Sequence, residues 1–143
     1  MGSRLLEVVG AVVVCKVLGE WAVLAFRRKP GKAAAGKWEF PGGKVEKRES
    51  QKVALVREIK EELGVEASVG EIVARSQVAV DDRVIDLNCY WVSLSEVPAT
   101  SADHDRIEWM ALSDVVYADW AEPDHDALRA LPALLAGERD ERE

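Results

Sequence analysis

The chain has 143 residues, of which 26 are acidic and 19 basic, so its formal net charge at pH 7 is −7. This length suits one domain with a hydrophobic core, and an apolar fraction of 48% is too high for a disordered chain. The acidic balance argues against stable nucleic-acid binding and, taken alone, against a phosphate-rich ligand.

The longest apolar run, residues 8–15, is shorter than the roughly 20 residues that a membrane-spanning helix needs. No small-residue cleavage site follows this run, so it is not predicted as a secretory signal. Cys15 and Cys89 lie in apolar strand-like segments, which favours two buried thiols in a reducing compartment over a disulfide. We therefore expect a soluble cytoplasmic protein, a monomer or homodimer, without membrane contact.

The N-terminal half is predicted to begin with strands. Residues 5–18, rich in valine, and residues 21–26 form a hairpin that turns at Gly19-Glu20. Residues 27–37 hold five cations and no acid, and their proline and two glycines indicate a loop. Residues 38–43 form a short extended segment with a kink. A helical pattern over 50–63 starts at Ser50 or Glu49 and ends before Gly64.

The C-terminal half adds further strands and helices. Residues 67–80 and 83–95 are predicted as an antiparallel hairpin, residues 98–105 as a loop and residues 106–112 as another strand. Ser113 is expected to cap a helix. A last helix begins at Pro123 or Asp124 and ends near Gly137, and the charged tail 138–143 is expected to fray. Strands mixed with about three helices predict one α/β or α+β domain over residues 1–143.

The helix predicted at 50–63 carries two distinct faces. At roughly 100° per residue, Glu58, Glu61 and Glu62 fall together on one arc, with the small residue Ala54 between them. An apolar arc, expected to face the core, is made by Val53, Leu55, Val56, Ile59 and Leu63. Three carboxylates on one face repel one another, but they could hold a hard divalent cation such as Mg²⁺.

An acidic helix face is often simply solvated, and two further features favour a metal site here. Arg57 lies at the edge of the acidic arc, where it can pair with a nearby carboxylate and orient it; Glu49 is the candidate. A glycine pair, Gly42 and Gly43, precedes the helix, where a backbone carbonyl can approach closely because no Cβ intrudes. Together with the converging carboxylates, these features predict a metal site.

The complete spacing is that of a known motif. Gly43, Glu49 and the run REIKEELGV at residues 57–65 resemble a Nudix box with every constrained position filled. The preceding residues 38–46, WEFPGGKVE, resemble the MutT and CTP pyrophosphohydrolase branch of that family, and the similarity extends over residues 7–135. The resemblance implies an α/β/α sandwich, with a mixed sheet flanked by helices and a loop–helix–loop catalytic motif. It also implies hydrolysis of a nucleoside diphosphate linked to another group.

The resemblance assigns roles to individual residues. Glu49 and Arg57 would orient the metal ligands without binding the metal themselves. Asp103, six residues before Trp109, occupies the position of a further acid from a later loop. Either Glu61 or Asp103 could take a proton from the attacking water. The ligands of Mg²⁺, or of Mn²⁺ in its place, would be the Gly42 carbonyl and the carboxylates of Glu58, Glu61 and Glu62.

Residues outside the box indicate the substrate class. The sequence motifs typical of ADP-ribose, dinucleoside polyphosphate, NADH and coenzyme A hydrolases are absent. The activity that remains is cleavage of a nucleoside triphosphate to a monophosphate and pyrophosphate. A carboxylate at Asp124 would suit the exocyclic amine of cytosine or of an oxidised guanine, unless it only caps a helix. His104 and His125 are expected at the surface, not as ligands. By resemblance, the substrate contacts are Arg27, Phe40, Lys44, Arg83 and Asp124.

Three functional hypotheses follow. The favoured one is a Mg²⁺-dependent (d)NTP pyrophosphohydrolase that acts on oxidised or pyrimidine nucleotides and cleans the nucleotide pool. A second is a Nudix diphosphatase for nucleotide sugars or RNA 5′ ends. A non-catalytic nucleotide-binding or protein-binding module is the least favoured, because the box is complete. The net charge does not exclude a polyanionic substrate, since residues 1–95 carry 15 basic and 13 acidic residues whereas residues 96–143 carry 4 and 13.

Overall fold

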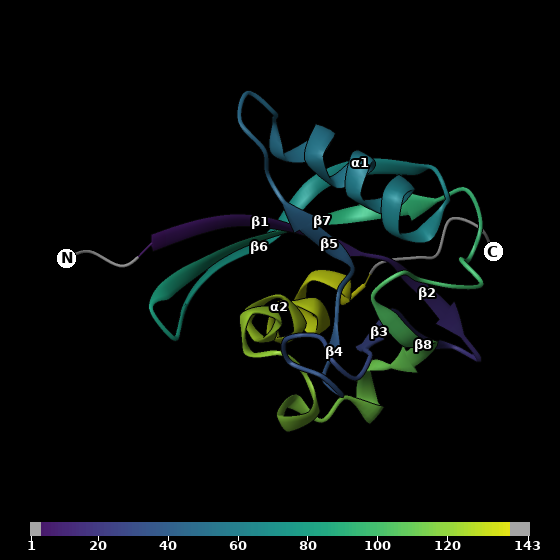
Figure 1. Ribbon diagram of the computed structural model, residues 1–143. Coiled ribbons are helices and arrows are strands. Elements are labelled where there is room, and N and C mark those ends of the chain that lie inside the picture. Colours follow the sequence, from purple (N-terminus) through teal and green to yellow (C-terminus); the bar gives the residue numbers. More distant parts are fainter. Residues whose placement is uncertain (1–3, 138–143) are drawn as a thin grey trace.

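The computed structural model describes residues 4–137, in which two α-helices cover opposite faces of a mixed sheet (Figure 1). The helices are α1 (Gln51–Leu63) and α2 (His125–Leu135). In the order β5-β1-β7-β6, the sheet contains β5 (Gly42–Lys44), β1 (Arg4–Val12), β7 (Arg83–Leu94) and β6 (Ala67–Val80). Strands β1 and β7 run parallel, and the outer strands run antiparallel to them. This arrangement confirms the predicted α/β/α sandwich.

The two faces of the sheet bury separate clusters of apolar side chains. On the side of α1, Leu55 and Ile59 pack with Val9 and other side chains of the sheet. On the side of α2, Leu128 packs with Leu87 and other side chains of the sheet. Because alternate side chains of a strand point to opposite faces, the same strands supply both clusters.

A second sheet lies beside the first and contains the segment predicted as the second strand. It is built by β2 (Val14–Val17), β3 (Glu20–Arg28), β4 (Trp38–Glu39) and β8 (His104–Ala111). The single strand predicted over 5–18 is divided at Val13, because β1 pairs with β5 and β7 whereas β2 pairs with β3. Strand β3 extends past the predicted end at Phe26, because Arg27 and Arg28 pair with β8.

The ends of α1 agree with the prediction, whereas its buried face is displaced from the predicted one. The Ser50 hydroxyl accepts the N–H of Val53 at 3.1 Å, and Gly64 has a left-handed φ of 73°. Leu55, Ile59 and Leu63 are buried as expected, but Val53 is 58% exposed and Val56 is also exposed. Ala54 is fully buried instead. The helix packs against β5 as well as β1 and β6, which moves the buried arc towards the acidic side.

The segment before α2 differs from the prediction at Ser113. That residue lies in a 3₁₀ turn (Leu112–Asp114) without a side-chain cap, and its hydroxyl donates to Glu20 across the second sheet at 3.4 Å. Two more 3₁₀ turns, Tyr117–Asp119 and Glu122–Asp124, lead into α2. Cys15 and Cys89 do not form a disulfide. The expected fraying of residues 138–143 lies outside the described residues.

Candidate active site

The loop before α1 is tied to the helix by Arg57. Its Nε and Nη2 atoms donate to the two carboxylate oxygens of Glu49 at 2.7 and 2.9 Å, and Nη2 also donates to the Lys44 carbonyl at 3.0 Å. Bonds from Arg57, and the N–H of Glu46, lower the pKa of Glu49 to about 2. The pairing predicted between Arg57 and Glu49 is therefore present, and Glu49 is held as a carboxylate.

The three box carboxylates differ in their exposure. The side chain of Glu61 is 61% exposed, that of Glu58 is 21% exposed and that of Glu62 is 10% exposed. Arg57 Nη1 lies 3.2 Å from Glu58 and 3.3 Å from Glu61, on the side opposite its contact with Glu49. Burial is the main cause that raises the pKa of Glu58. Glu61 therefore faces solvent, whereas Glu58 and Glu62 are mostly buried.

Glu62 is the most buried member and has an unsatisfied oxygen. Its Oε1 atom is buried without a hydrogen-bond partner. Burial, followed by a hydrogen bond with Asp103 and the charges of Asp103, Glu39 and Glu58, raises the pKa of Glu62 to about 9. Burial also acts to raise the pKa of Asp103, but hydrogen bonds with Lys32 and Glu62 outweigh it and the net shift is downward. Asp103 thus contacts Glu62 of the box, and its role in the site stays a prediction.

These residues fit a hard divalent cation. Oxygen donors predominate, and an unpaired buried carboxylate oxygen such as Glu62 Oε1 is a group that a cation would satisfy. A Cβ at Gly43 would lie 1.8 Å from Glu58 Oε2, so only glycine leaves that carboxylate its place beside the backbone. Within residues 4–137, no group of three or more acidic, histidine or cysteine side chains is arranged so that it could hold a metal ion as it stands.

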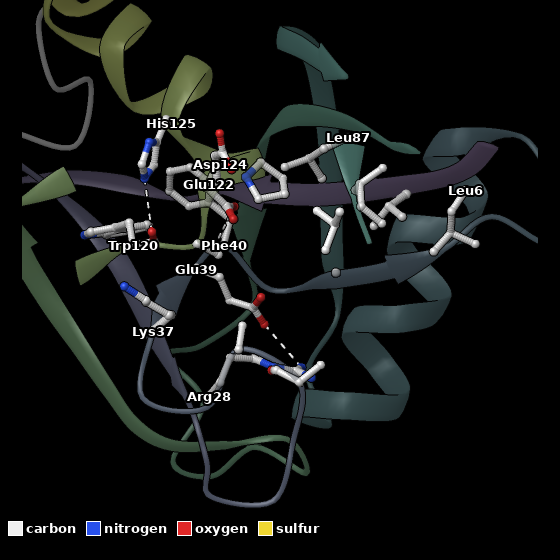
Figure 2. A pocket seen from close by; sticks show the side chains of 18 of the residues that line it. Leu6, Arg28, Lys37, Glu39, Phe40, Leu87, Trp120, Glu122, Asp124 and His125 are labelled. Atoms are coloured by element: carbon white, nitrogen blue, oxygen red, sulfur yellow. Dashed lines mark hydrogen bonds and ion pairs between the residues drawn. The ribbon is translucent and has the colours of Figure 1, made fainter. Parts of the chain in front are cut away.

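A cavity of about 630 Å³ opens beside the two glycines of the box. Figure 2 shows Phe40, Trp120 and Asp124 close together in its wall, with Leu6 towards the opposite end. Four of the five predicted substrate contacts line this cavity: Phe40, Lys44, Arg83 and Asp124. Gly42 and Gly43 line it too, so the cavity extends from the expected nucleotide contacts to the glycine pair of the box. The three box carboxylates are not among its lining residues.

The fifth predicted contact, Arg27, does not line the cavity. It forms a two-point ion pair with Asp105 at 2.8 and 3.0 Å. The next residue, Arg28, lines the cavity and contacts Glu39 at 3.4 Å (Figure 2). Successive residues of a strand point to opposite sides, so only one of two neighbouring arginines on β3 can face the cavity. Arg28 was not among the residues predicted from the sequence. The alternation of side chains along the strand is the sequence feature that could have shown that Arg27 and Arg28 face different sides.

Asp124 occupies the N-cap position of α2 without capping the helix. Its side chain makes no capping bond, and Oδ1 instead accepts the N–H of Phe40 at 3.2 Å. Burial, followed by the negative charge of Glu39, raises the pKa of Asp124 well above its ordinary value. The alternative that Asp124 only caps a helix therefore does not describe its side chain.

The two histidines differ from the surface positions expected for them. The His104 side chain is fully buried, so the expectation is wrong for this residue. His125 is half-buried, lines the cavity and hydrogen-bonds the Trp120 carbonyl at 3.0 Å through Nε2. His104 is enclosed by residues far away in the sequence, among them Phe26 and Glu39, which no local pattern reveals.

Comparisons with known proteins agree with this geometry. The NUDIX domain family model matches residues 5–131. The chain is 38% identical over 133 residues to CTP pyrophosphohydrolase of Escherichia coli (strain K12), covering 93% of this chain and 96% of that protein. It is 30% identical over 108 residues to 8-oxo-dGTP diphosphatase of the same organism, covering 76% and 84% of the two chains. The solution structure of the E. coli ORF135 protein matches with a TM-score of 0.73 and 36% identity, over 97% of this chain and 96% of that one.

The chain therefore belongs to the Nudix family and is a Nudix hydrolase. The family uses a divalent metal, which agrees with the oxygen-rich donor set of the box. Among the described residues, no helix has the length and apolar character required to span a membrane.

Proposed function

We propose that this protein is a Mg²⁺-dependent nucleoside triphosphate pyrophosphohydrolase that converts a (d)NTP and water into a (d)NMP and pyrophosphate. The observation that carries the proposal is that one cavity is lined both by Gly42 and Gly43 of the box and by the buried Asp124. The substrates would be oxidised or pyrimidine nucleotides, and the role would be nucleotide-pool sanitation in the cytoplasm. Relatives named CTP pyrophosphohydrolase and 8-oxo-dGTP diphosphatase support this substrate class.

In this proposal the box holds the metal and the reacting phosphates. Bound Mg²⁺, or Mn²⁺ in its place, would neutralise phosphate oxygens and lower the pKa of a bound water. The two candidates for the base are Glu61, which is open to solvent, and Asp103, whose lowered pKa keeps it ionised. Glu49 would act only through Arg57, which it orients. The ligands would be the Gly42 carbonyl, Glu58, Glu61 and Glu62.

The remaining contacts would bind the nucleotide. Lys44 and Arg83 supply positive charge at the cavity wall for the phosphate chain, and Arg28 is better placed for this role than the predicted Arg27. The Phe40 ring, 5.2 Å from that of Trp120, offers an aromatic surface to the base. Asp124 would accept a hydrogen bond from an exocyclic amine of the base, as in cytosine or an oxidised guanine.

The decisive experiment measures product identity over a panel of nucleotides with Mg²⁺ or Mn²⁺. Release of pyrophosphate from a nucleoside triphosphate supports the proposal, whereas release of orthophosphate or of a sugar phosphate overturns it. Glu61→Gln should lose activity. Glu71→Gln, the same substitution at an exposed position on β6 outside the site, should retain it. No hydrolysis of any nucleotide would leave only a binding module. The protein is expected to be either a monomer or a homodimer, and gel filtration would distinguish the two.

A further inference from the structure

His104 lies at the start of β8, where its side chain is fully enclosed. The residue pairs in register with Arg28 of β3, and its ring contacts the Phe26 ring edge-on at a centroid distance of 5.3 Å. A fully buried imidazole must satisfy both ring nitrogens with nearby partners, since no water reaches them. The partners of the two ring nitrogens therefore show which parts of the protein the ring connects.

The two nitrogens face different parts of the site. Nε2 lies 2.8 Å from Glu39 Oε2, and because a carboxylate oxygen accepts, Nε2 carries a proton in this contact. On the other edge, Nδ1 lies 2.7 Å from the Ser101 hydroxyl and 3.4 Å from Glu62 Oε1. The ring thus stands between a residue of the cavity wall and the most buried carboxylate of the box.

Glu39 and Glu62 are both contacted by this one ring. Glu39 lines the cavity and is contacted by Arg28, whereas Glu62 is an expected metal ligand whose Oε1 has no hydrogen bond. The Nε2–Oε2 distance to Glu39 is 2.8 Å and the Nδ1–Oε1 distance to Glu62 is 3.4 Å. A side chain with a polar nitrogen on each edge can therefore fix the positions of both carboxyl groups.

We propose that His104 is a positioning residue that holds Glu39 and Glu62 at a set distance and orientation, and so links the nucleotide cavity to the metal end of the site. Its action on nucleotide binding rests on the proposed function. Its action on Glu62 concerns the metal alone. The residue touches no expected reacting atom, so its removal acts through the two carboxylates.

Two substitutions test the contacts on the two edges of the ring one at a time. A glutamine amide can reach the place of Nε2 and an asparagine amide the place of Nδ1, so His104→Gln keeps the Glu39 contact and His104→Asn keeps the contact on the Glu62 side. Binding of Mn²⁺ alone, followed by electron paramagnetic resonance without nucleotide, should weaken about tenfold in His104→Gln and change little in His104→Asn. The KM for the nucleotide should rise roughly fivefold in His104→Asn.

Phe26→Leu is the matched control, because it removes ring packing from His104 and leaves the polar contacts in place. It should lower Tm without changing Mn²⁺ affinity or KM. Wild-type Mn²⁺ affinity in His104→Gln would overturn the proposal. The proposal also fails if Phe26→Leu reproduces the losses of both variants, because packing alone would then explain them. If the wild type hydrolyses no nucleotide, the proposed function fails, whereas the Mn²⁺ comparison still decides the role of His104.

Discussion

Arg57 and Glu49 form a two-point ion pair across the loop that precedes α1, with N–O distances of 2.7 and 2.9 Å. The remaining guanidinium nitrogen faces Glu58 and Glu61, so one side chain connects the loop to the acidic face of the helix. The position of the expected metal ligands thus depends on a carboxylate that is not itself a ligand.

The first prediction concerns the acid stability of this pair. The pKa of Glu49 is lowered from its ordinary value of 4.5 to about 2, so the folded state prefers the ionised form. Its contribution to stability is complete above pH 4.5 and is lost as the pH falls to about 2. The difference in unfolding free energy between wild type and Glu49→Gln should shrink over this window in urea titrations. A difference that stays constant with pH would contradict the assignment.

The contribution of Glu62 to stability should depend on pH in the opposite direction to that of Glu49. Its pKa is raised from 4.5 to about 9, so between these values the folded state holds a proton that the unfolded state releases. Its effect on the unfolding free energy therefore becomes less favourable as the pH rises from 4.5 to about 9. Without metal, Glu62→Gln should gain stability relative to wild type across that window, measured as Tm at several pH values. The same variant should bind Mn²⁺ less tightly. Parallel Tm curves for the two proteins would refute this prediction.

Alanine at each glycine of the box should produce a different defect. At Gly43 the new Cβ would meet the end of the Glu58 side chain, which can move away, so Gly43→Ala should fold and lose Mn²⁺ affinity. At Gly42 the new Cβ would lie 1.8 Å from the Val9 carbonyl oxygen, which belongs to β1. Gly42→Ala should lower the unfolding free energy by about 1–3 kcal/mol. Denaturant unfolding and Mn²⁺ titration of both variants check the contrast, and equal stability losses would contradict it.

Asp124→Asn tests base recognition without removing the buried contact. The N–H of Phe40 bonds Oδ1, so an amine of the base would meet the second oxygen, which must be ionised in the complex in order to accept. Asparagine replaces that oxygen with an NH₂ donor. Two facing donors in a buried site should reduce kcat/KM for the preferred nucleotide by roughly tenfold or more. Stability should stay near that of wild type. Unchanged kcat/KM across the nucleotide panel would show that Asp124 acts only on Phe40.

Arg27 and Arg28 provide a matched pair of adjacent cations on β3. Arg28 lines the cavity, so Arg28→Ala should raise the KM for a nucleoside triphosphate, roughly tenfold if a phosphate contact is lost. Arg27 pairs with Asp105 away from the cavity, and the loss of such a partly exposed pair should leave KM unchanged. Steady-state kinetics of the two variants decide between them. A larger KM effect at Arg27 would restore the interpretation drawn from the sequence.

Much of the box could be predicted because its interactions are local. Ser50 and Gly64 bound α1 through contacts within one helical turn, and Glu49 reaches Arg57 over only eight residues. Helical spacing alone also places Glu58, Glu61 and Glu62 on one face. Arrangements of this kind depend on backbone geometry and short sequence separations, both of which are visible in the order of residues.

The complete box already indicated, from the sequence by itself, a hydrolase that needs a divalent cation, and the net charge of −7 did not exclude it. Only the tertiary structure decided that the chain changes sheets at Val13, that Arg28 faces the cavity, and that His104 is buried beside Glu39. It also decided that Asp124 bonds Phe40, 84 residues away, in place of its own helix. Burial and pairing between distant segments arise from packing, and no local pattern contains them.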